Sequence, residues 1–122
     1  MSKSDITQFG LTQRAKKARD KIHNDLGWFN KAQDLLKFAI SVHLNTNGKE
    51  LGIIKGKKEN AYACNAVDDD GKLLELIYLY HPKTDVPYKI MENWINSGLE
   101  EMLKRVDNDE EFILTNYLQD KS

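Results

Sequence analysis

Apolar residues recur every three or four positions in four separate stretches of this 122-residue chain, and that spacing constrains its fold most strongly. The stretches cover residues 11–26, 32–43, 73–80 and 90–106. A helical period of 3.6 residues places such side chains on one face, whereas a strand alternates its faces at every second residue. The pattern predicts a single mainly α domain over 1–122, a compact bundle of four to five helices.

The first two helices are expected to form a helix-turn-helix pair reminiscent of a ribbon-helix-helix unit. Thr12 can cap a helix that runs to about residue 24, because its hydroxyl can accept a hydrogen bond from the first turn. Gly27 then supplies a turn that a β-carbon would hinder. A second helix is expected over 30–44, and its apolar face includes His43.

The segments around this pair are expected to be irregular. Residues 1–10 are predicted to be a flexible or extended lead-in, and residues 45–60 a basic loop that opens with the turn sequence Asn-Thr-Asn-Gly. A short strand at 51–54 fits the pattern. Residues 61–67 fit an extended and a helical conformation equally well.

Two longer helices are expected in the second half. The aspartate run at 68–70 places negative charge at the start of a helix over 73–80, where the helix dipole favours it. That helix is apolar on nearly every side and is expected to be the most buried element. A helix over 87–106 follows, and Gly98 in its interior predicts the close approach of another backbone. A short helix is expected at 109–118. Five large apolar side chains are assigned to the core or to a subunit interface: Trp28, Phe29, Phe38, Met91 and Trp94.

Charge is divided unequally along the chain. Residues 1–58 carry 12 Lys and Arg against 5 Asp and Glu, whereas residues 59–122 carry 6 against 14. A basic half can bind a polyanion, and an acidic half can repel that polyanion or dock on a basic partner. An uneven surface charge on an ordinary soluble domain is the alternative explanation.

Composition excludes several classes of protein. An apolar content of 40% and a charged content of 30% are typical of a soluble globular domain. The longest apolar run is too short to span a bilayer, and no apolar stretch follows the charged first residues as a signal peptide would require. Cys64 is the only cysteine, so no internal disulfide can form. We therefore expect a cytoplasmic protein with no membrane association.

Catalytic and metal motifs are missing from the sequence. Aligning Gly71 with the glycine of an EF-hand loop puts Ala66 and Ile77 at ligand positions, so the aspartate run is better explained as a helix cap. The three histidines lack the spacing of a metal site, and Cys64 has no nearby histidine or CxxC partner. No phosphate-binding glycine loop or GxSxG motif occurs. His43 is expected to be a hydrogen-bonded core histidine. The prediction is a protein that is not an enzyme and holds no cofactor.

The basic residues of the first half are the best candidates for a function. They lie on the two expected helices and in the loop that follows, and such positive surfaces bind phosphates without reading sequence. The residues assigned to DNA contact are Arg14, Lys16, Lys17, Lys21, Lys37, Lys49, Lys55, Lys57 and Lys58.

Two segments resemble one family. Residues 35–44, Leu-Leu-Lys-Phe-Ala-Ile-Ser-Val-His-Leu, are similar to the second helix of DndE, whose pattern is Leu-Cys-Arg-aromatic-Ala-apolar-Cys-Leu-Ser-Leu. Residues 94–99, Trp-Ile-Asn-Ser-Gly-Leu, are similar to the family's His-Ile-Glu-Arg-Gly-Ile, and a leucine and Arg-Val follow at 103–106. DndE is the small subunit of the DNA sulfur modification (phosphorothioation) machinery. The resemblance covers roughly half of the chain.

The resemblance implies a helical protein that forms a homo-oligomer and binds DNA as an accessory to sulfur-transferring partner proteins in the cytoplasm. Residues 23–26 and Ser97 stand where the family has basic residues, and the family's cysteines are replaced. The resemblance therefore supports a similar fold, but it gives weaker support for transferring the family's individual DNA contacts. Two alternatives stay open: a protein-interaction adaptor that does not bind DNA, and a ribbon-helix-helix regulator whose residues 5–11 pair with a second chain.

Overall fold

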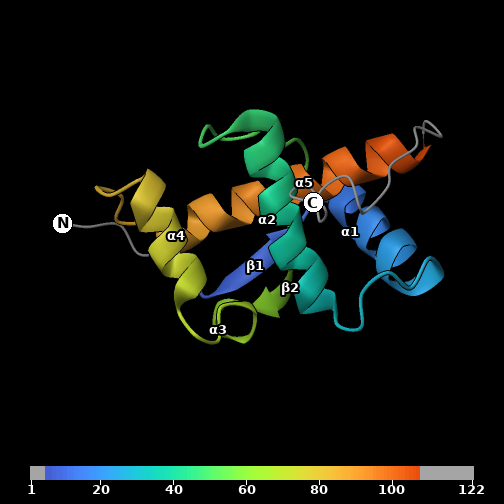
Figure 1. Ribbon diagram of the computed structural model, residues 1–122, viewed down its shortest axis with the longest axis horizontal. Coiled ribbons are helices and arrows are strands. Elements are labelled where there is room, and N and C mark those ends of the chain that lie inside the picture. The colour runs from blue at the N-terminus through green and yellow to red at the C-terminus, as the bar shows by residue number, and fades with distance from the viewer. Residues whose placement is uncertain (1–4, 108–122) are drawn as a thin grey trace, which may run out of the picture.

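The computed structural model describes residues 5–107, and 61% of them are helical (Figure 1). This confirms the mainly α prediction; the helix expected at 109–118 lies outside the described residues. The elements in chain order are β1 (Gln8–Leu11), α1 (Gln13–Arg19), the π-helical turn η1 (Asp20–Asp25), α2 (Ala32–Asn47), β2 (Glu59–Ala63), α3 (Cys64–Val67), α4 (Lys72–Tyr80) and α5 (Pro87–Asp107).

Helices α2 and α5 cross at the centre of the molecule and form its main packing contact (Figure 1). Gly98 allows this crossing, because a β-carbon built there would lie 1.9 Å from the carbonyl oxygen of Ala39. The close approach that the sequence predicted is confirmed. Met91 and Trp94 of α5 are fully buried in the core that surrounds this contact. Trp28, Phe29 and Phe38 are partly buried and pack against that core.

The end of the predicted lead-in takes the extended one of its two expected conformations. Residues 8–11 form β1, which pairs antiparallel with β2 of the same chain. Phe9 and Leu11 are fully buried. A four-residue strand depends on its partner and on burial for stability, and here the partner lies about 50 positions away in sequence. Local patterns therefore gave no sign of it.

The predicted boundaries of the loop and the second helix need correction. The strand expected at 51–54 does not form, and β2 begins only at Glu59. Residues 61–67, left open by the sequence, divide into the end of β2 and the short helix α3. Helix α2 begins two residues later than expected and continues to Asn47, where Gly48, with a positive φ of 65°, ends it.

Helix α4 forms where the sequence predicted it, but it is not the most buried element. Only Ile77 is fully buried, and Leu79 is 75% exposed. The helix lies at one end of the molecule and packs one face against α5, which leaves its other apolar faces at the surface (Figure 1). Burial within one copy of the chain therefore does not explain why α4 is apolar on nearly every side.

Buried polar side chains fix the start of α1 against α5. The Thr12 hydroxyl accepts from the Ala15 N–H at 3.0 Å, which confirms the predicted cap. Asn96 is fully buried; its Oδ1 accepts from the Thr12 N–H at 2.8 Å, and its Nδ2 donates to the Gly10 carbonyl at 2.9 Å. The first turn of α1, which carries Arg14, is thereby held in one place relative to α5.

Candidate nucleic-acid interface

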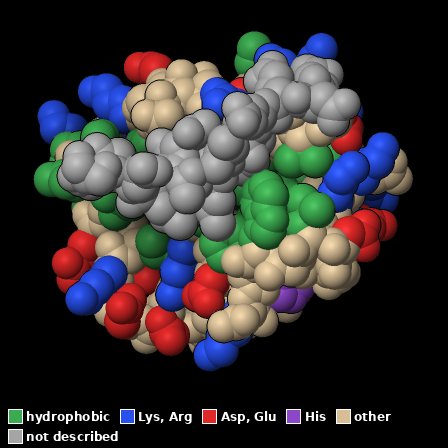
Figure 2. Space-filling model, turned by 45° about the vertical axis from the view of Figure 1, so that its right-hand side comes forward, with side chains coloured by type: hydrophobic (Ala, Val, Ile, Leu, Met, Phe, Trp, Pro, Cys, Tyr) green, Lys and Arg blue, Asp and Glu red, His purple; other side chains and the backbone are tan. Residues whose placement is uncertain are grey.

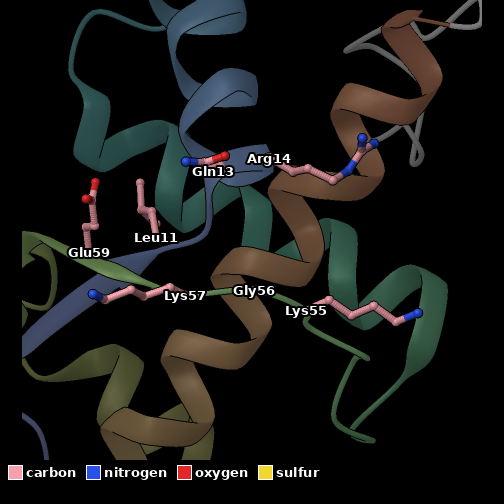
Figure 3. A pocket seen from close by; sticks show the side chains of 7 residues that line it. All are labelled: Leu11, Gln13, Arg14, Lys55, Gly56, Lys57 and Glu59. Carbon is pink, nitrogen blue, oxygen red and sulfur yellow. The ribbon is translucent and has the colours of Figure 1, made fainter.

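A hollow of about 440 Å³ lies between the first turn of α1 and the loop before β2 (Figure 3). We call it the basic hollow, and its lining residues are Leu11, Gln13, Arg14, Lys55, Gly56, Lys57 and Glu59. Within residues 5–107, Arg14, Lys55 and Lys57 form no ion pair. The carboxylate of Glu59 is instead paired with Lys16. Folding thus brings three of the predicted DNA-contact residues to one hollow, where no described acid pairs with them.

The three cations do not converge on one point. Lys57 extends toward the side where Leu11 and Glu59 lie, whereas Arg14 and Lys55 extend to the opposite side (Figure 3). A single phosphate ion is best held by donors that point to a common centre. Charges spread along a surface are better suited to a chain of phosphates, in which successive groups meet different side chains.

Arg14 also borders a second hollow, of about 590 Å³, beside α5. Lys104 lines this hollow, so folding adds a cation from the acidic half of the sequence that the sequence analysis did not select. Two carboxylates also line it. Glu100 accepts from the Thr12 hydroxyl at 2.7 Å, and Glu101 is paired with Arg105 at 2.8 Å. The sequence shows only that Lys104 lies on the same helical face as Glu100, one turn earlier, and this spacing is also that of an ordinary surface ion pair.

Four other predicted contact residues are paired with acids of the second half, so the basic and acidic halves are not separated in space. The pairs are Lys16–Glu59, Lys21–Asp107 at 3.8 Å, Lys37–Asp69 at 3.9 Å and Lys58–Glu92 at 2.5 Å. On the face in Figure 2, basic and acidic side chains lie interspersed. Folding thus compensates four of the 12 cations of the first half with acids of the second, because the two halves pack against each other.

These ion pairs differ in how easily the lysine can exchange its carboxylate partner for a phosphate. Lys16, Lys21 and Lys37 are paired at the surface, where an ion pair contributes little and can exchange. Lys58 compensates Glu92, which is only 7% exposed and also accepts the Gly10 N–H at 2.8 Å. The main role of Lys58 is therefore to compensate the buried Glu92 carboxylate and not to bind a ligand. The remaining two residues, Lys17 on α1 and Lys49 after α2, are exposed and do not line the basic hollow.

The loop that carries Lys55 and Lys57 is held to α5 and α2. The Asn93 side chain accepts from the Gly52 N–H at 2.7 Å and donates to the Gly52 carbonyl at 3.0 Å. His43 Nε2 donates to the Glu50 carbonyl at 2.7 Å, which leaves Nδ1 to accept from the Ser97 hydroxyl at 2.8 Å. Burial lowers the pKa of His43, so the neutral ring is favoured. The predicted hydrogen-bonded core histidine is confirmed.

The aspartate run acts as a helix cap. The two carboxylate oxygens of Asp68 accept from the N–H groups of Leu73 and Leu74 at 2.9 and 3.1 Å. The Tyr88 hydroxyl donates to Asp68 at 3.1 Å. Across the described part of the chain, no group of three or more His, Cys, Asp or Glu side chains could hold a metal ion. Burial raises the pKa of Cys64 to about 12, which keeps it a thiol.

Comparison with known proteins adds no relative: no family model, no curated protein and no solved structure matches this chain significantly. Among residues 5–107, no helix is both long enough and apolar enough to cross a membrane.

Proposed function

We propose that this chain is a DNA-binding accessory subunit of a DNA sulfur modification (phosphorothioation) system. The observation that carries the DNA-binding part is the group Arg14, Lys55 and Lys57, which lines one hollow and forms no ion pair within residues 5–107. Their role is contact with the phosphate backbone. Sulfur transfer itself belongs to partner proteins, and the complex acts in the cytoplasm.

The resemblance to DndE supports the choice of system. The first similar segment lies in α2 and the second in α5, and these helices form the central packing contact. The alanine and the glycine that the two patterns share with the family are Ala39 and Gly98, and a β-carbon added at Gly98 would meet the backbone of Ala39. One packed helix pair therefore accounts for both similar segments.

Fluorescence anisotropy with a labelled duplex, measured over a range of salt concentrations, tests the DNA contact. We expect a dissociation constant of about 1–100 µM that depends weakly on sequence. The triple variant Arg14→Glu, Lys55→Glu, Lys57→Glu should weaken binding and reduce the salt slope by roughly 2–3, since each lost phosphate contact removes about 0.9.

The matched control reverses three exposed lysines that lie elsewhere, Lys72, Lys83 and Lys89. A uniform charge effect would weaken both triple variants equally and would contradict a defined site. Deletion of the gene in its host, followed by mass spectrometry of phosphorothioate linkages in digested DNA, tests the system. Unchanged linkage content would overturn that assignment.

The adaptor function is favoured by a different observation. Four of the nine predicted contact residues are paired with acids of the same chain, which reduces the charge available to DNA. Absence of any anisotropy change with duplex at about 100 µM protein and low salt would leave the adaptor as the better proposal.

A further inference from the structure

The loop before β2 presents two apolar side chains to solvent. Ile53 is 85% exposed and Leu51 is 56% exposed. Isolated exposed apolar residues are common on protein surfaces. These two instead lie together on one short segment and line the same hollow beside α5.

The backbone of this segment is fixed, so the side chains cannot easily turn inward. Gly52, between the two apolar residues, forms two hydrogen bonds with Asn93. A β-carbon at Gly52 would lie 2.4 Å from the Ser97 hydroxyl oxygen, so the backbone sits directly on α5. The Glu50 carbonyl is held by His43. The exposure of Ile53 is therefore built into the loop, and a ligand that contacts it meets a preorganised surface.

Cations surround this apolar pair. Arg14 and Lys104 line the same hollow as Leu51 and Ile53, and Lys55 follows two residues later. Arg14 and Lys55 extend to the same side (Figure 3). The carboxylates in this hollow, Glu100 and Glu101, are both engaged with other side chains. The chemistry is an apolar tip near basic side chains, which suits a ligand that carries apolar faces and phosphates.

We propose that Ile53, supported by Leu51, is an apolar wedge that enters a groove of duplex DNA and partly unstacks a base step. Arg14 and Lys55 then hold neighbouring phosphates. Aliphatic side chains act in this way in proteins that kink DNA, where the lost stacking is offset by additional contacts with the bent duplex. The wedge rests on the proposed DNA-binding function, and it assigns a kinking action to that same surface.

A duplex that contains 2-aminopurine and a donor–acceptor dye pair at its ends tests the wedge. Wild-type protein should raise 2-aminopurine emission and shorten the end-to-end distance, since the base analogue brightens when it is unstacked. Ile53→Ala should lose at least half of both signals at saturation and weaken binding about five- to tenfold. Its salt slope should stay unchanged, because no cation is removed. Leu26→Ala, which truncates an exposed apolar residue after η1, is the control and should behave as wild type.

The outcomes separate the two proposals. Binding without any change of either signal, equal in wild type and Ile53→Ala, overturns the wedge and leaves DNA binding in place. Absence of binding by the wild type overturns both. Light scattering of Ile53→Asp without DNA supplies the remaining check. A lower assembly mass than the wild type would make Ile53 a contact between copies of the chain, which also overturns the wedge.

Discussion

The ammonium group of Lys58 lies 2.5 Å from the carboxylate of Glu92, and this pair joins the loop before β2 to the buried side of α5. Glu92 uses its second oxygen to accept the N–H of Gly10 in β1. One carboxylate thus ties three segments together, and removing it leaves a backbone donor and a cation without their partner.

We therefore expect Glu92→Ala to lower the free energy of unfolding by about 2–3 kcal/mol, as for hydrogen bonds to a charged group. Lys58→Ala should cost about 1 kcal/mol, since that side chain is partly exposed and its charge is screened. Urea unfolding followed by circular dichroism measures both. Lys57→Ala is the neighbouring control and should change stability very little; a loss equal to that of Lys58→Ala would contradict the structural role of the pair.

Substitution of Gly98 tests the contact between α2 and α5. Helix propensity alone predicts that Gly98→Ala stabilises the protein by about 1 kcal/mol. The structure predicts the opposite, a loss above about 3 kcal/mol, because the added methyl group would overlap the Ala39 carbonyl. Thermal unfolding distinguishes these outcomes by sign. Lys104→Ala on the same helix controls for propensity, and a rise in melting temperature for Gly98→Ala would refute the packing contact.

Acid should weaken the fold through His43. Burial lowers its pKa in the folded state, so below the ordinary histidine value of about 6.5 the unfolded chain binds more protons than the folded one. Stability therefore falls as pH falls from about 6.5 toward the depressed folded pKa. Urea unfolding between about pH 7.5 and 5 should show a smaller pH dependence for His43→Gln than for wild type. His81→Gln, after the end of α4, should retain the wild-type dependence; equal slopes in all three proteins would remove His43 from this role.

Helix α4 should contact another copy of the chain. Leu79 is 75% exposed, and Tyr78 and Tyr80 beside it are also exposed. Light scattering should therefore give a mass that is a multiple of 14.1 kDa. Leu79→Glu should reduce that mass, whereas Lys72→Glu, at the other end of α4, should not. A monomer mass for the wild type at micromolar concentration would contradict the assembly.

The sequence predicts this fold best where the signal is local. The Thr12 cap, the cap formed by Asp68 and the crossing at Gly98 all depend on a helix pattern that one segment carries by itself. It fails where a partner is distant. The strand that contains Phe9 is stable only against β2, and no residue near it indicates that pairing.

The candidate site, like the fold, can be predicted from the sequence only where the signal is local. The basic character of Arg14, Lys55 and Lys57 can be recognised in the sequence, but their shared hollow depends on how the loop docks on α5. The pairing of Lys58 with Glu92 spans 34 positions and has no local signature. The basic residues can thus be selected from the sequence. The sequence does not show which of these cations face solvent and which pair with acids of the same chain.

The hydrogen bonds of Asn96 have a consequence for how the chain folds during synthesis. Asn96 binds Gly10 and Thr12, which precede it by 86 and 84 positions. Strand β1 therefore lacks these partners until α5 has been synthesised, more than 80 residues later. Such long-range closure slows folding and leaves early segments without their partners for much of translation. The buried apolar side chains of β1 are exposed during that interval, so this strand is vulnerable to aggregation until α5 has been made.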